Sequence, residues 1–124
     1  MANEYLTVTL TGRPPAKIKK ADWPHLASAS DNDRHGAQIG NRADWENLVV
    51  RQHSDGRAMV YAIYGEFGLV IRGGELLEKD DDLVKAIGRV AERMAISVGL
   101  EGRPGGVFRR LANECIAALP AVEL

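Results

Sequence analysis

Apolar and polar residues alternate along the N-terminal segment of the chain, and this spacing of two predicts a β-strand. In residues 5–11 (YLTVTLT) leucines and a valine alternate with threonines, so one face of a half-buried strand is apolar. Pro14 and Pro15 follow and end the strand, because proline cannot donate a hydrogen bond to a neighbouring strand. A shorter apolar segment, residues 69–72 (LVIR), predicts a further strand that ends at Gly73-Gly74.

The strongest local signal is the sequence NLVVRQHS-DG-RAMVYAIY, in which two apolar segments flank Asp55-Gly56. Asp-Gly is typical of tight two-residue hairpins, so we predict a central β-hairpin with Gln52 opposite Met59. One face of this hairpin would carry Leu48, Val50, Gln52, Met59, Tyr61 and Ile63. This is the more apolar face, and we expect helices to cover it.

The other face of the hairpin mixes apolar, aromatic and charged side chains. Its members are Val49, Arg51, His53, Val60, Ala62 and Tyr64. If helices cover only the first face, this one is exposed, and tyrosine and arginine supply much of the energy of protein interfaces. The residues predicted to bind a partner protein here are Arg51, His53, Val60 and Tyr64. The alternative is that another segment of the chain covers this face.

Two helices are predicted near the C-terminus, where the apolar spacing changes to three and four. The first covers residues 83–98, with the aspartates 80–82 at the positive end of its dipole and Gly99 at its end. The second begins near Val107 and ends before Pro120. Its expected buried side chains are Phe108, Leu111, Cys115 and Leu119.

A third, short helix is predicted near the N-terminus. Asp22 is a suitable N-cap, and Trp23 and Pro24 would fill the first turn, where a missing N–H is harmless. The helix would extend to about Ala29. Residues 30–41 (SDNDRHGAQIGN) are polar and predict a long exposed loop.

These elements predict one α+β domain over residues 1–124. It would have an antiparallel sheet of about four strands with a central β-hairpin, two C-terminal helices packed on one face and a short N-terminal helix.

Charge and composition argue against several classes of function. The 124 residues include 16 Lys+Arg and 17 Asp+Glu, a formal net charge of -1, which indicates neither a general affinity for nucleic acid nor an acidic mimic of DNA. No apolar run approaches the roughly 18 residues needed to cross a bilayer, and the polar start is unlike a signal peptide. We therefore expect a cytoplasmic protein with no membrane partner.

Candidate catalytic residues are few. None of His25, His35 and His53 has a second histidine or a cysteine at the spacing of a local metal motif. His53 and Asp55 flank the predicted turn, where aspartate has a structural role, and Cys115 lies on an apolar stripe as an expected buried thiol. We therefore expect no enzymatic activity, no cofactor and no metal. An enzyme with a composite site would need one pocket that holds histidine and carboxylate together.

A basic stretch near the N-terminus is the basis of an alternative function. Its residues are Arg13, Lys17, Lys19, Lys20 and Trp23. A nucleic-acid-binding accessory or regulatory protein could use the cations on phosphates and the indole to stack on bases. The structural alternative is a solvated edge strand, with Trp23 anchored in the core.

An acidic stretch precedes the first C-terminal helix. The predicted partner-binding acids are Glu75, Glu78, Asp80 and Asp81, with Asp82 next to them. They could dock into a basic groove of a partner protein. The structural alternative is that they stabilise the positive end of the helix, which accounts for the aspartates better than for the glutamates.

Four segments together resemble a group of small proteins of proteobacterial phages and mobile elements. The segments are TVTLTGRPPAKIKKADWP, VRQHSDGRAMVY, RGGELL and LANECIAALPAVEL. None is a motif of known chemistry, so the resemblance assigns no functional residue. It implies a context in which small proteins without a catalytic signature bind a host protein, as anti-CRISPR inhibitors do. We expect a non-enzymatic protein-binding module, such as an inhibitor of a bacterial defence complex, with a homodimer as the alternative use of the exposed sheet face.

Overall fold

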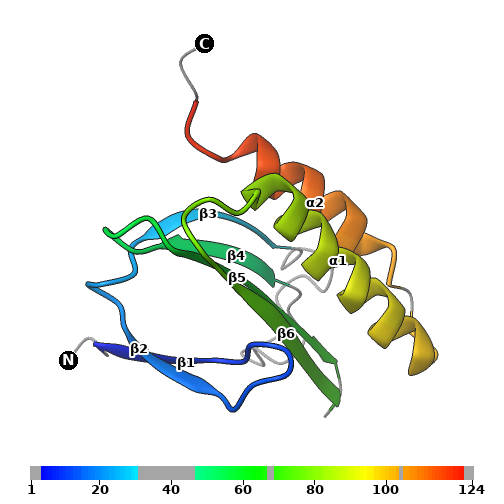
Figure 1. Cartoon of the computed structure of the whole chain (residues 1–124). Coiled ribbons are helices and arrows are strands. Elements are labelled where there is room, and N and C mark those ends of the chain that lie inside the picture. Colours follow the sequence, from blue (N-terminus) through cyan, green and yellow to red (C-terminus); the bar gives the residue numbers. More distant parts are fainter. Residues whose placement is uncertain (1–3, 31–46, 67–68, 104, 122–124) are drawn as a thin grey trace.

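The computed structural model describes residues 4–30, 47–66, 69–103 and 105–121. Two antiparallel sheets and two helices make up the fold (Figure 1). The strands are β1 (Tyr5–Val8), β2 (Ala16–Lys19), β3 (His25–Ser30), β4 (Asn47–Gln52), β5 (Ala58–Glu66) and β6 (Leu69–Leu77); the helices are α1 (Leu83–Leu100) and α2 (Val107–Ala117). β1 pairs with β2, and the other strands form one sheet in the order β3-β4-β5-β6.

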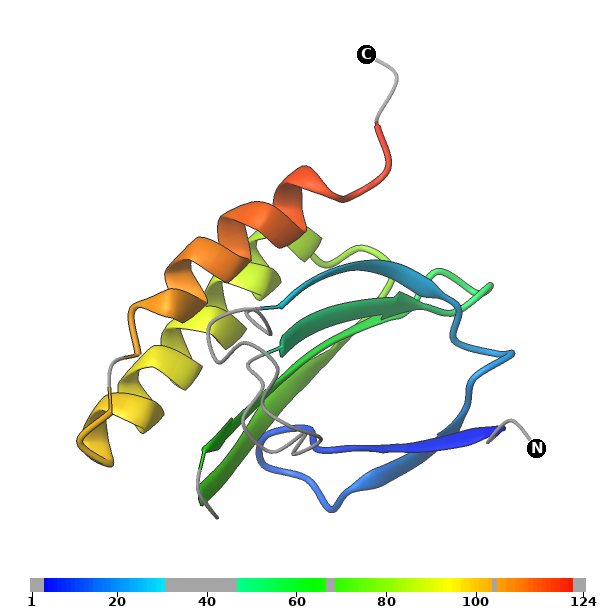
Figure 2. The same ribbon diagram turned by 180° about the vertical axis from the view of Figure 1, so that it is seen from behind.

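The elements form three layers. α1 packs against β5 and β6, and α2 packs against β3 and β4, so both helices cover one face of the four-stranded sheet, the helix face (Figures 1 and 2). The β1–β2 hairpin lies on the opposite side, the outer face (Figure 2). The predicted α+β class, antiparallel strands and C-terminal helices are confirmed, but the strands form two sheets rather than one.

The predicted short helix at residues 22–29 is wrong, because this segment contains strand β3. Side chains along β3 alternate: Ala27 and Ala29 are buried, whereas Ser28 and Ser30 are exposed. β3 pairs with β4, which satisfies backbone groups that a short isolated helix would leave to its caps. The tertiary neighbour therefore overrides the helix-start signal in the sequence.

The hairpin of β4 and β5 turns where predicted, but its register differs by one residue. Gln52 pairs with Ala58 rather than with the residue after it. The N–H of His53 donates to the carbonyl of Arg57 (2.8 Å), and Gly56 has φ 97°. This is a three-residue loop with glycine in the left-handed position, in place of the tighter two-residue turn.

The change of register exchanges the two faces of β5, because successive side chains of a strand point to opposite sides. The side chains of β4 and β5 in the core under the helices are Leu48, Val50, Ala58, Val60, Ala62 and Tyr64. Met59 and Tyr61, predicted to lie under the helices, lie instead on the outer face against the β1–β2 hairpin.

Strand β6 does not end at Gly73-Gly74 as predicted but continues through both glycines. A Cβ atom on Gly74 would lie 2.8 Å from the carbonyl oxygen of Thr9, closer than a side chain permits. The segment after β1 therefore crosses the edge of the sheet where only glycine lets it approach. There the N–H of Thr11 donates to the carbonyl of Gly74 (2.8 Å).

Both C-terminal helices begin close to their predicted positions. The carboxylate of Asp82 caps α1 by accepting a hydrogen bond from the N–H of Lys85 (3.1 Å). α1 continues past its predicted end at Gly99, and the left-handed glycine that follows it is Gly102 (φ 77°). In and after α2, Phe108, Leu111 and Cys115 are buried as predicted and Leu119 is partly buried.

Each face of the four-stranded sheet has its own hydrophobic core. The helix-side core joins α1 and α2 to the sheet. The hairpin-side core joins the β1–β2 hairpin to the outer face, and its buried members are Val8, Leu10, Ile18, Trp23, Met59 and Tyr61.

Two further sequence predictions concern membrane spans and the loop. Neither helix of the described chain is long and apolar enough to span a bilayer. Of the predicted loop at residues 30–41, Ser30 ends β3 and the remainder lies outside the described residues.

Candidate functional site

Part of the surface predicted to bind a partner lies inside the protein. The side chains of Val60 and Tyr64 are both 0% exposed, because they face the helices. The ring of Tyr64 packs against that of Phe108 on α2, with 6.4 Å between the ring centroids. The prediction that these two residues form an exposed docking face is wrong, and the cause is the register of the hairpin.

Arg51 and His53 lie on the outer face, where they hold Trp23. Arg51 donates from Nη1 to the carbonyl oxygen of Trp23 (3.0 Å) and from Nε to the hydroxyl of Tyr61 (3.1 Å). The ring of His53 meets the ring of Trp23 edge-on, with 5.0 Å between centroids. Both side chains therefore support the hairpin-side core.

The predicted partner-binding acids do not form one free surface, because two arginines of α1 bind the carboxylate of Glu75. Arg89 donates to this carboxylate from Nε (3.0 Å) and Nη2 (2.8 Å), and Arg93 donates from Nη2 (2.6 Å). The hydrogen bonds from Arg89 are the largest influence and hold the pKa of Glu75 below its ordinary value. Asp81 accepts from the N–H of Glu78 (2.9 Å) in the turn before α1, where Asp80 is exposed.

The basic residues are brought together only in part. Lys17 and Lys19 are exposed on β2, and the ammonium of Lys17 lies 4.8 Å from the ring centroid of Tyr5. Arg13 and Lys20, also exposed, lie beyond the two ends of β2. Trp23 is only 8% exposed, and the guanidinium of Arg57 lies 5.2 Å from its ring centroid. Its indole therefore has little free surface for a base to stack on and anchors the hairpin-side core.

The remaining candidate catalytic residues are Cys115 and the three histidines. Cys115 is 0% exposed, and burial raises its pKa to about 11, so the predicted buried thiol is confirmed. Nδ1 of His53 accepts from the N–H of Asp55 (3.1 Å) within the turn. His25 is exposed on β3, and His35 lies outside the described residues. Within the described ranges, no three His, Cys, Asp or Glu side chains gather as a metal site.

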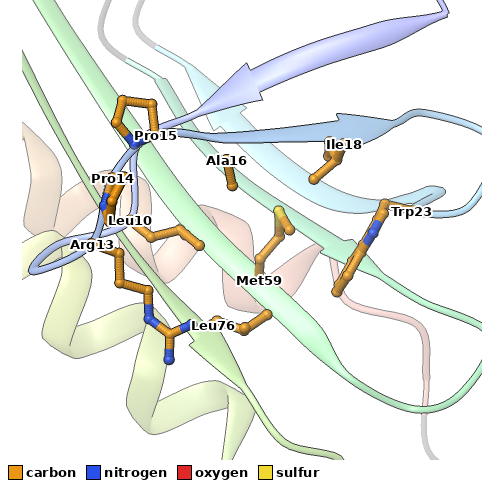
Figure 3. A pocket seen from close by; sticks show the side chains of 9 residues that line it. All are labelled: Leu10, Arg13, Pro14, Pro15, Ala16, Ile18, Trp23, Met59 and Leu76. Carbon is orange, nitrogen blue, oxygen red and sulfur yellow. The ribbon is translucent and has the colours of Figure 1, made fainter.

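An open cleft of about 510 Å³ lies between the β1–β2 hairpin and the outer face of the sheet (Figure 3). Its lining residues are Leu10, Arg13, Pro14, Pro15, Ala16, Ile18, Trp23, Met59 and Leu76. Met59 and Leu76 reach it from the four-stranded sheet, and Ala16 and Ile18 reach it from β2 (Figure 3). Trp23 stands at one end and Arg13 at the other.

The lining of the cleft determines what it can do chemically. Among the described residues, neither this lining nor those of two smaller hollows, one beside Gly73 and one beside Leu83, contains a histidine. The cleft lining also contains no carboxylate or thiol, and Arg13 is its charged side chain. Such an arrangement can bury an apolar group and pair with an anion beside it.

The chain around the cleft is cationic, although the whole protein is not. Residues 4–24 contain four Lys or Arg and two Asp or Glu, a formal excess of two positive charges against a net charge of -1 for the chain. The backbone N–H of Arg13 donates to the carbonyl of Leu10 (3.1 Å), but its guanidinium makes no hydrogen bond or ion pair with the described residues. Within the described chain, this guanidinium could therefore pair with an anionic group of a ligand.

Sequence reasoning missed the cleft because residues 16–19 were too few to indicate a strand. A usable signal is present, since the apolar side of residues 5–11, the turn with Pro14 and Pro15, and Ile18 together make a hairpin with one apolar face. Such a face needs a covering surface, and the outer face of the sheet supplies it only in part.

Comparisons with models of protein families, with curated proteins and with solved structures give no match to this chain. Its function is therefore inferred from the cleft and from the charges around it.

Proposed function

We propose that this is a non-enzymatic binding protein whose cleft receives an apolar segment of a partner protein. The observation that carries the proposal is the open apolar cleft on the outer face, bordered by the cationic hairpin and by Arg13, whose guanidinium has no partner among the described residues. One apolar anchor inserted into a preformed pocket commonly supplies much of the energy of a protein interface.

Several side chains that line the cleft are already packed in the unbound protein. Trp23 is held through its backbone by Arg51 and through its ring by His53 and Arg57. Met59 is 1% exposed and Ile18 7%, so their side chains are packed rather than free to rearrange. A site that needs little ordering loses less conformational entropy on binding, which favours affinity.

The charge around the cleft indicates the chemistry of the partner. A segment with aspartate or glutamate next to its apolar anchor could pair with Arg13 and approach the lysines of the hairpin favourably. We infer an acidic, apolar segment as the ligand. The resemblance to phage and mobile-element proteins supports a host protein, such as part of a bacterial defence complex, as the source of that segment.

The proposal is tested by selecting peptides from a random phage-displayed library on the full-length protein. Enriched peptides should combine an apolar residue with an adjacent aspartate or glutamate. Ala16→Leu, which adds three carbons inside the cleft, and Arg13→Gln, which removes its charge, should each weaken the binding of a selected synthetic peptide by about tenfold. Ala117→Leu and Arg109→Gln, both on exposed positions of α2, are the matched controls and should bind as the parent does.

Other outcomes separate the alternatives. Peptides that bind equally to the parent and to Ala16→Leu contradict the proposal. A nucleic-acid function would appear as a gel shift of single-stranded DNA at low salt that disappears at physiological salt. A homodimer through the outer face would appear in light scattering as a mass that Ala16→Leu halves.

A further inference from the structure

A second pocket, of about 130 Å³, lies at the edge of the four-stranded sheet, away from the cleft. Its lining residues are Thr11, Arg72, Gly73, Gly74, Val90, Arg93, Met94 and Ser97. The polar side chains come from three parts of the chain: the turn after β1, strand β6 and helix α1. Arg93 and Ser97 are four residues apart on α1 and so lie on one side of the helix.

The charge of this pocket is positive and only partly neutralised. Its lining holds two guanidinium groups and no carboxylate. The backbone of Arg72 pairs with Ile63 in the sheet, but its guanidinium makes no hydrogen bond or ion pair with other described residues. Arg93 uses Nη2 to bind Glu75, a carboxylate that Arg89 also holds by two donors. The two lining arginines, Arg72 and Arg93, together with Glu75 leave a formal charge of +1. Arg89, which shares Glu75, lies outside the lining and also interacts with Asp81 and Asp82.

The hydroxyl oxygen of Thr11 is positioned by a hydrogen bond from the backbone of β6. Its Oγ1 accepts a hydrogen bond from the N–H of Gly74 (3.2 Å), so its own proton is free for another acceptor. Gly73 keeps the space open, because a Cβ there would lie 3.3 Å from Thr11 Oγ1 and 3.6 Å from the sulfur of Met94. Ser97 adds a second hydroxyl to the lining.

We propose that this pocket binds one tetrahedral oxyanion, the phosphate group of inorganic phosphate or of a small phosphomonoester. Guanidinium groups and hydroxyls are the side chains that recognise phosphate oxygens, arginine often through two parallel hydrogen bonds. A pocket of about 130 Å³ has room for one such group, since a water molecule takes about 30 Å³ in the liquid. Any remainder of an ester would lie in solvent.

The test is a ¹⁵N–¹H NMR titration of the full chain with sodium phosphate at constant ionic strength. Saturable shifts are expected at the amides of Gly73, Gly74 and Ser97. Arg72→Gln and Arg93→Gln should each weaken phosphate binding by about tenfold. Arg72→Lys keeps the charge without the planar donors, so its phosphate affinity should lie between those of the parent and Arg72→Gln. Arg109→Gln removes an arginine paired with Glu92 on the helices and should leave the phosphate affinity unchanged.

The same titration with O-phosphoserine distinguishes the two sources of the group. Tighter binding of phosphoserine identifies an ester as the occupant, and tighter binding of inorganic phosphate identifies the free anion. Absent or non-saturating shifts with both, or equal losses in Arg72→Gln and Arg109→Gln, overturn the proposal. Because Arg72 is exposed, Arg72→Gln is expected to fold, which a thermal melt of each variant verifies.

Discussion

Helices cover one face of the four-stranded sheet and a two-stranded hairpin covers the other, and the two interfaces are filled to different degrees. Among the described residues, the helix-side core contains 20 buried residues and the hairpin-side core contains six. An open cleft of about 510 Å³ remains beside the smaller core. The comparison indicates that the helix face provides most of the stability and that the outer face is where the fold leaves room for a ligand.

The difference follows from what each element can bury. α1 and α2 place side chains such as Ile87 and Phe108 over the sheet in a close-packed layer. The β1 and β2 strands have four residues each, and a two-stranded hairpin is too narrow to cover a four-stranded sheet. Within the described chain, the part of the outer face that the hairpin does not cover lines the cleft.

The largest expected effect is a large-to-small change in the helix-side core. Phe108→Ala removes a fully buried ring and should lower the free energy of unfolding by about 3 to 5 kcal/mol. Ile18→Ala should cost about 2 kcal/mol, because its site adjoins a cleft that solvent already reaches. Urea denaturation measures both. A larger loss for Ile18→Ala than for Phe108→Ala would contradict the comparison.

The contact between the hairpin and the sheet edge is tested at a glycine. Gly74→Ala would place a Cβ 2.8 Å from the carbonyl oxygen of Thr9 in the crossing segment and should destabilise the protein by about 1 to 3 kcal/mol. Gly88→Ala is the control, since nothing lies within 4 Å of its added Cβ inside α1. It should stabilise the protein by up to about 1 kcal/mol through helix propensity. If thermal melts give both changes the same sign, the close crossing at Gly74 is wrong.

The packing of the two faces can also be compared by adding side-chain volume to each. Ala62→Leu inserts three carbons into the close-packed helix-side core and should cost about 1 to 3 kcal/mol. Ala16→Leu adds the same carbons where the cleft is open, so the free energy of unfolding should change by less than about 0.5 kcal/mol. Equal losses in urea denaturation would show that the outer face is as tightly filled as the helix face.

The smallest effect concerns the ion pairs that join β6 to α1. The pKa of Glu75 lies below its ordinary value of 4.5, so its contribution to stability is complete above that pH and is lost as the pH falls through the lowered pKa. Glu75→Gln should cost about 1 kcal/mol at neutral pH and nothing in strong acid, and denaturation across pH measures this. Glu92→Gln should lower the free energy of unfolding by less, because the Glu92 side chain is 51% exposed whereas that of Glu75 is 17% exposed.

Much of the fold could be predicted because its signals are local. The apolar spacing of residues 83–98 specifies α1, and Asp82 supplies its cap. Asp55-Gly56 specifies the hairpin of β4 and β5. What local signals could not supply is the length of the loop, because a two-residue and a three-residue turn both suit this dipeptide. That single residue decides which side of β5 faces the helices.

The cleft and the second pocket beside Gly73 could not be predicted, since both depend on contacts between distant segments. Leu10 and Met59 meet only after the hairpin has docked on the outer face. Thr11 reaches Arg72 and Ser97 only because Gly74 admits the crossing chain. Strand β3 was missed for the same kind of reason, because its pairing with β4 overrides a local helix signal.

The central claim, that the outer face is the binding face, is tested most directly with protein labelled at the methyl carbon of methionine. Met59 lines the cleft, and Met94 lies in the helix-side core beside the second pocket. A selected acidic, apolar peptide should shift the Met59 methyl signal to saturation and leave that of Met94 in place. A peptide that binds while shifting Met94 alone, or neither signal, would contradict the account.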